Sequence, residues 1–179
     1  YASSSVIGLN SRRYHGILIA SKNPPADRMV MVSKVEEKMI LNNREYQLST
    51  NQYADTIYPD GYRYITHFNR SPFPQILYEV HEAALQKTVF MVHESNTSIV
   101  EYTNTSNIGF QLWLNPLYAG RGYHSLLHER ENYEYQSNIN SNYQSVQPHT
   151  SLDPVFFRHT AGFFAEGRTW NKQLKYVID

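Results

Sequence analysis

The chain has 179 residues, a length that predicts one domain large enough to bury a hydrophobic core. Its 16 basic and 16 acidic side chains balance, so no net positive charge attracts nucleic acid, and no apolar run is long enough to cross a membrane. The absence of cysteine excludes disulfide bonds and thiolate chemistry. No export signal opens the sequence, so we expect a cytoplasmic protein. Because the first residue is Tyr1 rather than methionine, we also expect a piece of a longer protein.

The first part of the chain is rich in residues that favour strands. In residues 10–21, NSRRYHGILIAS, a strand is predicted to begin directly after a run of polar side chains. Residues 28–50 are predicted to form a hairpin around Asn42-Asn43, because asparagine tolerates the positive φ angles of tight turns. Residues 52–74 contain proline and glycine turn signals, and we predict an ordered, functional loop there.

The remaining strand candidates are short and are separated by Asn, Gly, Ser and Pro. They are residues 75–84, 85–94, 97–106, 108–118, 132–138, 142–148, 154–160, 162–167 and 170–178. No helix-length segment lies between them, which predicts antiparallel pairing rather than β-α-β units. A dozen strands fit two sheets better than one. We therefore predict a single all-β domain over residues 1–179, built as a large antiparallel two-sheet β-sandwich.

The acidic residues do not indicate a catalytic pair. Glycoside hydrolysis uses two carboxyl groups held about 5 to 9.5 Å apart. Glu36 and Glu37 are neighbours on a predicted strand and must point to opposite faces of the sheet. Glu129, Glu131 and Glu134 lie in a strongly charged segment. All five are predicted to be exposed to solvent, as most acidic residues are.

Other catalytic and metal-binding patterns are incomplete. His124 and His128 have the i, i+4 spacing of a zinc pair on a helix, but the glutamate of that motif and a third ligand are missing. The sequence also has no G-x-S-x-G elbow and no phosphate-binding glycine loop. We therefore predict no metal, no cofactor and no catalytic residue in this chain.

Two clusters of arginine, tyrosine and histidine carry the most distinctive chemistry. Their members are Arg12, Arg13, Tyr14 and His15 in the first and Arg121, Tyr123 and His124 in the second. Guanidinium and imidazole donors beside tyrosine rings suit uncharged, hydroxyl-rich ligands such as sugars. The alternative is structural, with an arginine paired to a carboxylate and a histidine bonded to the backbone.

The two clusters are predicted to meet in space. Loops of distant strands gather at common ends of an antiparallel sandwich, so both Tyr-His pairs are expected in one polar aromatic patch. Neighbouring strand residues alternate faces, so Tyr14 and His15 can both enter the patch only if the strand begins with a bulge or turn.

The same segments resemble the amino-terminal domain of bacterial and archaeal glycogen debranching enzymes of the amylo-α-1,6-glucosidase type. The resemblance runs in order over residues 1–125, and its most specific strings are RRYHG at 12–16 and RGYHS at 121–125. Later, WNKQLKYVID at 170–179 is similar to the family's exit strand. One departure is Gly122, where the family commonly has an acidic residue, so the partner of Arg121 is an open question.

The resemblance implies a supersandwich-like accessory domain, followed in the full enzyme by an (α/α)6-barrel that carries the catalytic carboxylates and is absent from this chain. It implies that the domain packs on that barrel and that the seven cluster residues help to bind an α-glucan at its branch point. Two other functions stay open: an independent glucan-binding module and a purely structural, stabilising domain. The sequence does not distinguish the glucan, the stereochemical outcome or the oligomeric state.

Overall fold

The computed structural model describes residues 5–24, 26–129, 135–147, 149–167 and 169–179. These residues form strands joined by short turns, with one 3-10 turn, η1 (Gly61–Tyr64). The strands are β1 (Leu18–Asn23), β2 (Ala26–Leu41), β3 (Arg44–Gln47), β4 (Thr50–Gln52), β5 (Ile57–Asp60), β6 (Ile65–Asn69), β7 (Gln75–Val80), β8 (Ala83–Met91), β9 (Ser98–Asn104), β10 (Gln111–Gly122), β11 (Gln136–Ile139), β12 (Gln144–Gln147) and β13 (Val155–Phe157). Every pairing among them is antiparallel, which confirms the all-β prediction.

The first large sheet is organised around β2, a strand of 16 residues. Its first half pairs with β1, its last four residues pair with β3, and β10 follows its other edge. The β2–β3 turn has positive φ angles of 50° at Asn42 and 63° at Asn43, as predicted from the sequence. β10 reaches Gly122 through two register shifts, and these irregularities lie just before the second Arg-Tyr-His cluster.

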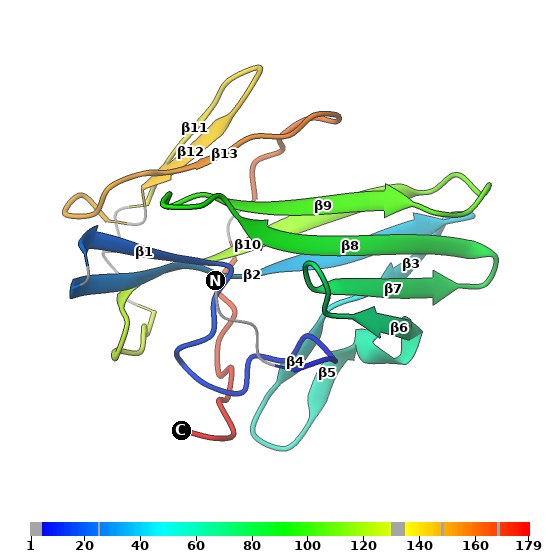
Figure 1. Cartoon of the computed structure of the whole chain (residues 1–179), viewed down its shortest axis with the longest axis horizontal. Helices are drawn as coiled ribbons and strands as arrows, with labels where there is room; N and C mark the ends of the chain where they lie inside the picture. Colours follow the sequence, from blue (N-terminus) through cyan, green and yellow to red (C-terminus); the bar gives the residue numbers. More distant parts are fainter. Residues whose placement is uncertain (1–4, 25, 130–134, 148, 168) are drawn as a thin grey trace.

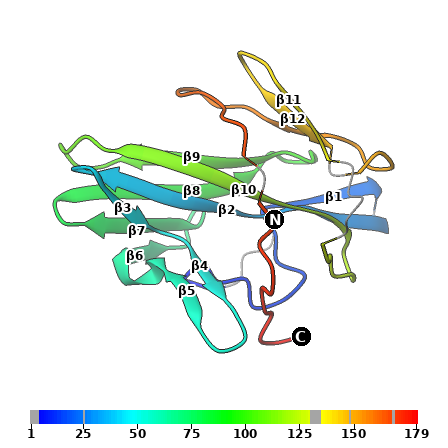
Figure 2. The same ribbon diagram turned by 180° about the vertical axis from the view of Figure 1, so that it is seen from behind.

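The second large sheet has the strand order β6-β7-β8-β9 and lies against the first (Figure 1). Figure 2 shows the same two layers from behind, with β2 and β10 on the near side. The core between them joins Met39 and Leu41 of β2 to Tyr78 of β7 and Leu85 of β8. Burial of these apolar side chains holds the two sheets together as a sandwich, as predicted.

Two small sheets add to the sandwich. β11, β12 and β13 form one of them, and its Val155 packs with Met31 and Val32 of β2 in a second core cluster. β4 and β5 form the other. Figure 1 shows β11–β13 beyond one edge of the sandwich and β4–β5 beyond the opposite edge.

The prediction that residues 52–74 form a loop was wrong, because regular structure occupies much of the segment. This segment contains β5, η1 and β6. Gly61 makes a close approach to the chain at Leu48 possible, because a Cβ on Gly61 would lie 2.1 Å from the Leu48 carbonyl carbon. The backbone N–H of Gly61 then donates to Ser49 O at 2.9 Å. Apolar residues such as Ile65 pack on the core. This packing stabilises regular structure in a segment that contains several prolines.

Two predicted strands near the end of the chain are also not formed. Residues 162–167 and 170–178 have no strand structure where they are described. The second segment makes isolated backbone bonds instead, from Lys175 N to Gln52 O at 2.8 Å and from Ile178 N to Ser11 O at 3.0 Å. A pattern of alternating residues becomes a strand only where a partner offers a continuous ladder of hydrogen bonds.

A charged group lies in the interior of the sandwich, which contradicts the predicted exposure of Glu37. The side chain of Glu37 is 2% exposed and accepts bonds from Lys87 Nζ at 2.5 Å and Tyr102 Oη at 2.7 Å. Ser49 Oγ donates to its other oxygen at 3.3 Å. Burial, followed by the nearby Glu37 charge, raises the pKa of Tyr102 well above its usual value. We call Glu37, Lys87, Tyr102 and Ser49 the buried polar centre.

Among the described residues, the structure contains no helix of the length and apolar character that a membrane span requires.

Candidate functional site

The first cluster forms a turn directly before β1. The N–H of His15 donates to Arg12 O at 3.1 Å, so residues 12–15 fold back before the strand begins. Gly16 follows because the chain passes close to β2 there: a Cβ on Gly16 would lie 3.0 Å from Val30 Cγ1 and 3.1 Å from Val32 O. The string RRYHG therefore encodes a turn and then a close contact between neighbouring strands.

The second cluster lies at the end of β10. Arg121 pairs with Val30 on β2, and the N–H of Tyr123 donates to Arg28 O at 3.0 Å. The N–H of Ser125 then donates to Gly122 O at 3.0 Å, which closes a second turn. Because β1 and β10 pair with the same part of β2, the two turns emerge beside each other.

Three aromatic side chains from the two turns form a compact group, which we call the ring cluster: Tyr14, Tyr123 and His124. The Tyr14 ring centroid lies 4.8 Å from that of Tyr123 and 5.5 Å from that of His124, and the Tyr123 and His124 centroids are 5.4 Å apart. Tyr14 Oη and His124 Nδ1 are 3.4 Å apart. Both tyrosines are half-buried and His124 is exposed. The structure thus places these three predicted residues together.

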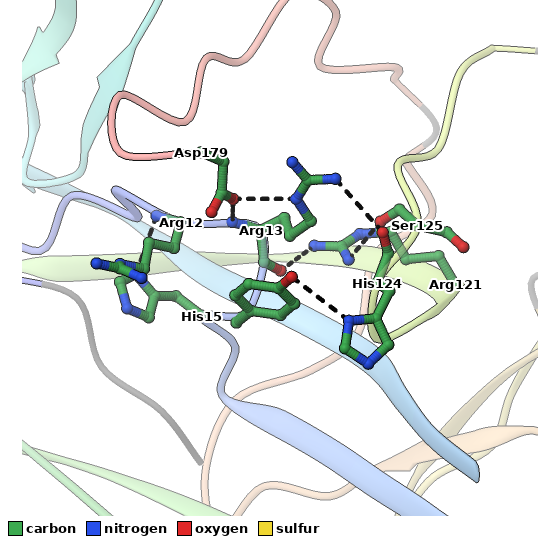
Figure 3. A network of polar contacts seen from close by, with 8 residues as sticks. Arg12, Arg13, His15, Arg121, His124, Ser125 and Asp179 are labelled. Atoms are coloured by element: carbon green, nitrogen blue, oxygen red, sulfur yellow. Dashed lines mark hydrogen bonds and ion pairs between the residues drawn. The ribbon is translucent and has the colours of Figure 1, made fainter.

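Two arginines connect the two turns, as Figure 3 shows. Arg121 is 5% exposed, and its guanidinium donates to Arg13 O at 2.5 Å and to Ser125 O at 2.8 Å. Arg13 donates in the opposite direction, to His124 O at 3.4 Å. Each arginine therefore binds a backbone carbonyl of the other turn. Arg13 O and Ser125 O are the partners of Arg121 that the sequence left open.

The final segment of the chain completes this arrangement. Asp179 accepts bonds from the backbone N–H of Arg13 and from Arg13 Nε, the latter at 3.2 Å. The backbone bond, followed by the Arg13 side-chain bond and charge, lowers the pKa of the Asp179 carboxyl group. Tyr176 lies with its ring centroid 6.0 Å from Arg121 Cζ. Sequence reasoning did not identify Tyr176 or Asp179, because nothing in the sequence links them to residues more than fifty positions away.

His15 and Arg12 occupy a different position. The backbone N–H of Arg12 donates to His15 Nδ1 at 3.3 Å, so this imidazole caps its own turn. Figure 3 shows His15 beside Arg12 and away from His124. Partial burial and then the Arg12 charge lower the pKa of His15, while Asp179 acts in the opposite direction. Of the two predicted Tyr-His pairs, only Tyr14 of the first lies in the ring cluster.

The other acidic residues considered in the sequence differ in their surroundings. Glu129 is exposed, as predicted, and pairs with Lys172 at 2.5 Å. Glu131 and Glu134 lie outside the described residues. Glu36 was predicted to be exposed but is half-buried, and it accepts a bond from Asn51 at 2.6 Å. In the described part of the chain, no three His, Cys, Asp or Glu side chains form a group that could hold a metal ion.

We call the contact between the two turns and residues 176–179 the junction. The fold and the junction define an antiparallel β-sandwich domain with a polar aromatic cluster. A family model described as glycogen debranching enzyme N terminal matches residues 1–179. The chain therefore belongs to the glycogen debranching enzyme N-terminal family, as its resemblance indicated. No curated protein and no solved structure matches it.

Proposed function

We propose that this chain is a non-catalytic amino-terminal domain of a cytoplasmic glycogen debranching enzyme of the amylo-α-1,6-glucosidase type. In this proposal it packs on the (α/α)6-barrel catalytic domain of the same polypeptide. The ring cluster then faces an α-glucan near its branch point. The observation that carries the proposal is the convergence of Tyr14, Tyr123 and His124, together with membership of the family.

The chemistry of the ring cluster suits an uncharged sugar. Tyrosine rings offer apolar faces to the C–H groups of a pyranose, and hydroxyl and imidazole groups exchange hydrogen bonds with its hydroxyls. Rings that are held in place lose little conformational freedom on binding, which favours affinity. The half-buried state of both tyrosines and the exposure of His124 support this role.

Tethering to polymer is the competing function, and the geometry favours it less. A flat binding platform needs nearly coplanar aromatic rings on one sheet face. The rings here are inclined to one another by 41°, 76° and 82°, and they belong to turns. Such an arrangement fits a shaped recess at a domain boundary better than a flat surface.

The test uses the full-length enzyme that carries this domain. We expect Tyr123→Ala to lower kcat/KM for a branched glucan by about threefold to tenfold, the size of one aromatic contact. His67→Ala is the matched control, because His67 is an exposed aromatic residue on β6 in the other sheet. Unchanged debranching by Tyr123→Ala would contradict the proposal. Tethering would be favoured instead if Tyr123→Ala lowered the affinity of the 179-residue chain for glycogen but left the kcat/KM of the full-length enzyme on short branched substrates unchanged.

A further inference from the structure

The two arginines of the junction, Arg13 and Arg121, donate their hydrogen bonds to groups of the protein itself. Arg121 donates to two backbone carbonyls, one in each turn, and Arg13 donates to a carbonyl of the second turn and to Asp179. The side chain of Arg13 is 30% exposed and that of Asp179 is 10% exposed. Arg121 is buried, and Arg13 is paired with Asp179, although sequence reasoning grouped both arginines with the sugar-binding residues.

The bonds to carbonyls fix the backbone at the residues that carry the rings. Arg13 O, the acceptor of Arg121, belongs to the residue before Tyr14. His124 O and Ser125 O, the acceptors of Arg13 and Arg121, belong to the second turn. A planar guanidinium holds two acceptors in a fixed geometry, which an ammonium group does not. The pair therefore sets the distance between the turns and, with it, the distances between the rings.

We infer that Arg13 and Arg121 are positioning residues, each of which binds a backbone carbonyl of the other turn, and that they leave ligand contact to Tyr14, Tyr123 and His124. This inference rests on the proposed function for its ligand, but the positioning itself can be observed without one. Asp179 and Tyr176 belong to the same device, because they orient Arg13 and cover Arg121. The site is thus built from three segments that are far apart in sequence.

The first experiment measures ring positions in the 179-residue chain by proton NMR. The His124 imidazole lies edge-on to two tyrosine rings, so its carbon-bound protons should be displaced from their random-coil positions by ring currents. His124→Gln identifies the signals. We expect Arg121→Ala to return them towards random-coil values, and Arg121→Lys to move them less, since an ammonium can still bind one carbonyl.

Two further variants make the result decisive. Arg28→Ala removes a cation that lies 5.9 Å from the Tyr123 ring, and it should leave the His124 signals in place because it breaks none of the bonds between the turns. If Arg121→Ala fails to fold, Arg13→Gln replaces it, because the Arg13 side chain is partly exposed and its loss leaves a smaller cavity. Unmoved His124 signals in whichever of these two variants folds would overturn the inference.

The second experiment separates this inference from the proposed function. In the full-length enzyme, a positioning role requires that Arg121→Ala costs less activity once one of the rings that it positions is gone, so the loss in the Arg121→Ala/His124→Ala double variant should be smaller than the product of the two single losses. Multiplicative losses would mean that Arg121 acts on the ligand itself and would overturn positioning. If the NMR signals move as expected while no variant changes debranching, the arginines position the rings and the proposed function fails.

Discussion

The buried polar centre and the ring cluster with its two arginines both place tyrosines beside paired charges, but they differ in what surrounds them. In the centre, Glu37 and Lys87 face each other between the two large sheets, and Tyr102 donates to the same carboxylate. At the junction, the charged groups also pair inwards, but the rings of Tyr14, Tyr123 and His124 reach the surface. Charge is therefore used in both places to fix geometry, and only the second place leaves polar aromatic groups available to a ligand.

This difference explains why we propose no ligand for the buried polar centre. Its groups saturate one another, and the core around it is formed by Met39, Tyr78 and Leu85. Taking charges out of water is costly, and the mutual bonds offset that cost only when all partners are present. The centre should therefore respond to mutation through stability, whereas the ring cluster should respond through function.

The largest expected effect is on the centre. Lys87→Met leaves the Glu37 carboxylate buried without its cation, and we expect a loss of about 3 to 5 kcal/mol in the free energy of unfolding, measured with denaturant. The Glu37→Gln/Lys87→Met double variant carries no charge in the buried polar centre and keeps an acceptor for Tyr102, so it should recover a large part of the loss. A loss below about 1 kcal/mol for the single variant would show that Glu37 is not a buried charge.

A pH titration sharpens the comparison with another buried charged group, Lys34 of β2. Lys34 donates to Thr50 O and to Asn51 Oδ1 at 3.0 Å, and burial lowers its pKa from 10.5 to about 8. A folded-state pKa below the unfolded value means that stability rises between pH 8 and pH 10.5 and is lost as the pH falls through 8. We expect the difference in unfolding free energy between the native chain and Lys34→Met to grow by up to about 3 kcal/mol over that range.

The quantity to measure is the difference in unfolding free energy between the native chain and the Lys34→Met variant. Tyr78 and Tyr102 have raised pKa values, so their contribution falls as the pH rises through 10, but they are present in both chains. A difference that stays flat from pH 7.5 to pH 10 would contradict the lowered pKa of Lys34.

The smallest expected effect is at the ring cluster. His124 is exposed, and we expect His124→Ala to change the free energy of unfolding by less than about 0.5 kcal/mol, measured by the same denaturation. The same substitution in the full-length enzyme should reduce debranching. A stability loss above about 1.5 kcal/mol would instead assign the ring cluster a structural role and remove the contrast with the buried polar centre.

Local signals in the sequence predicted much of this fold. The Asn42-Asn43 turn and most of the strands follow from residue type and spacing, because tight turns and pleated strands have few acceptable sequences. The meeting of the two turns followed from the repeated Arg-x-Tyr-His pattern and the geometry of a sandwich. The failure over residues 52–74 arose because Gly61 packs on the distant backbone of Leu48, and sequence patterns do not display such contacts.

The sequence contains a signal for the burial of Glu37, which is its position in the alternation of β2. Glu37 has the same strand parity as Val35, Met39 and Leu41, all of which are buried, so alternation places it on the core face. Lys87 likewise has the parity of Leu85 and Val89 on β8. An acidic and a basic residue on two apolar strand faces indicate a buried pair. The bond between Arg13 and Asp179 has no comparable signal, because it joins two ends of the chain without any periodic pattern.

The length of β2 also bears on the order in which the chain folds. Its pairings with β1 and β3 are hairpins between neighbours in sequence, whereas β10 pairs with it across about 70 to 90 positions. Closing a short loop costs less chain entropy than closing a long one, so the β1-β2 and β2-β3 hairpins should form first. Pulsed hydrogen exchange during refolding should therefore protect amides in β2 and β3 before those in β10. The junction between the two turns, which needs β10 in place, would then be among the last parts of the molecule to assemble.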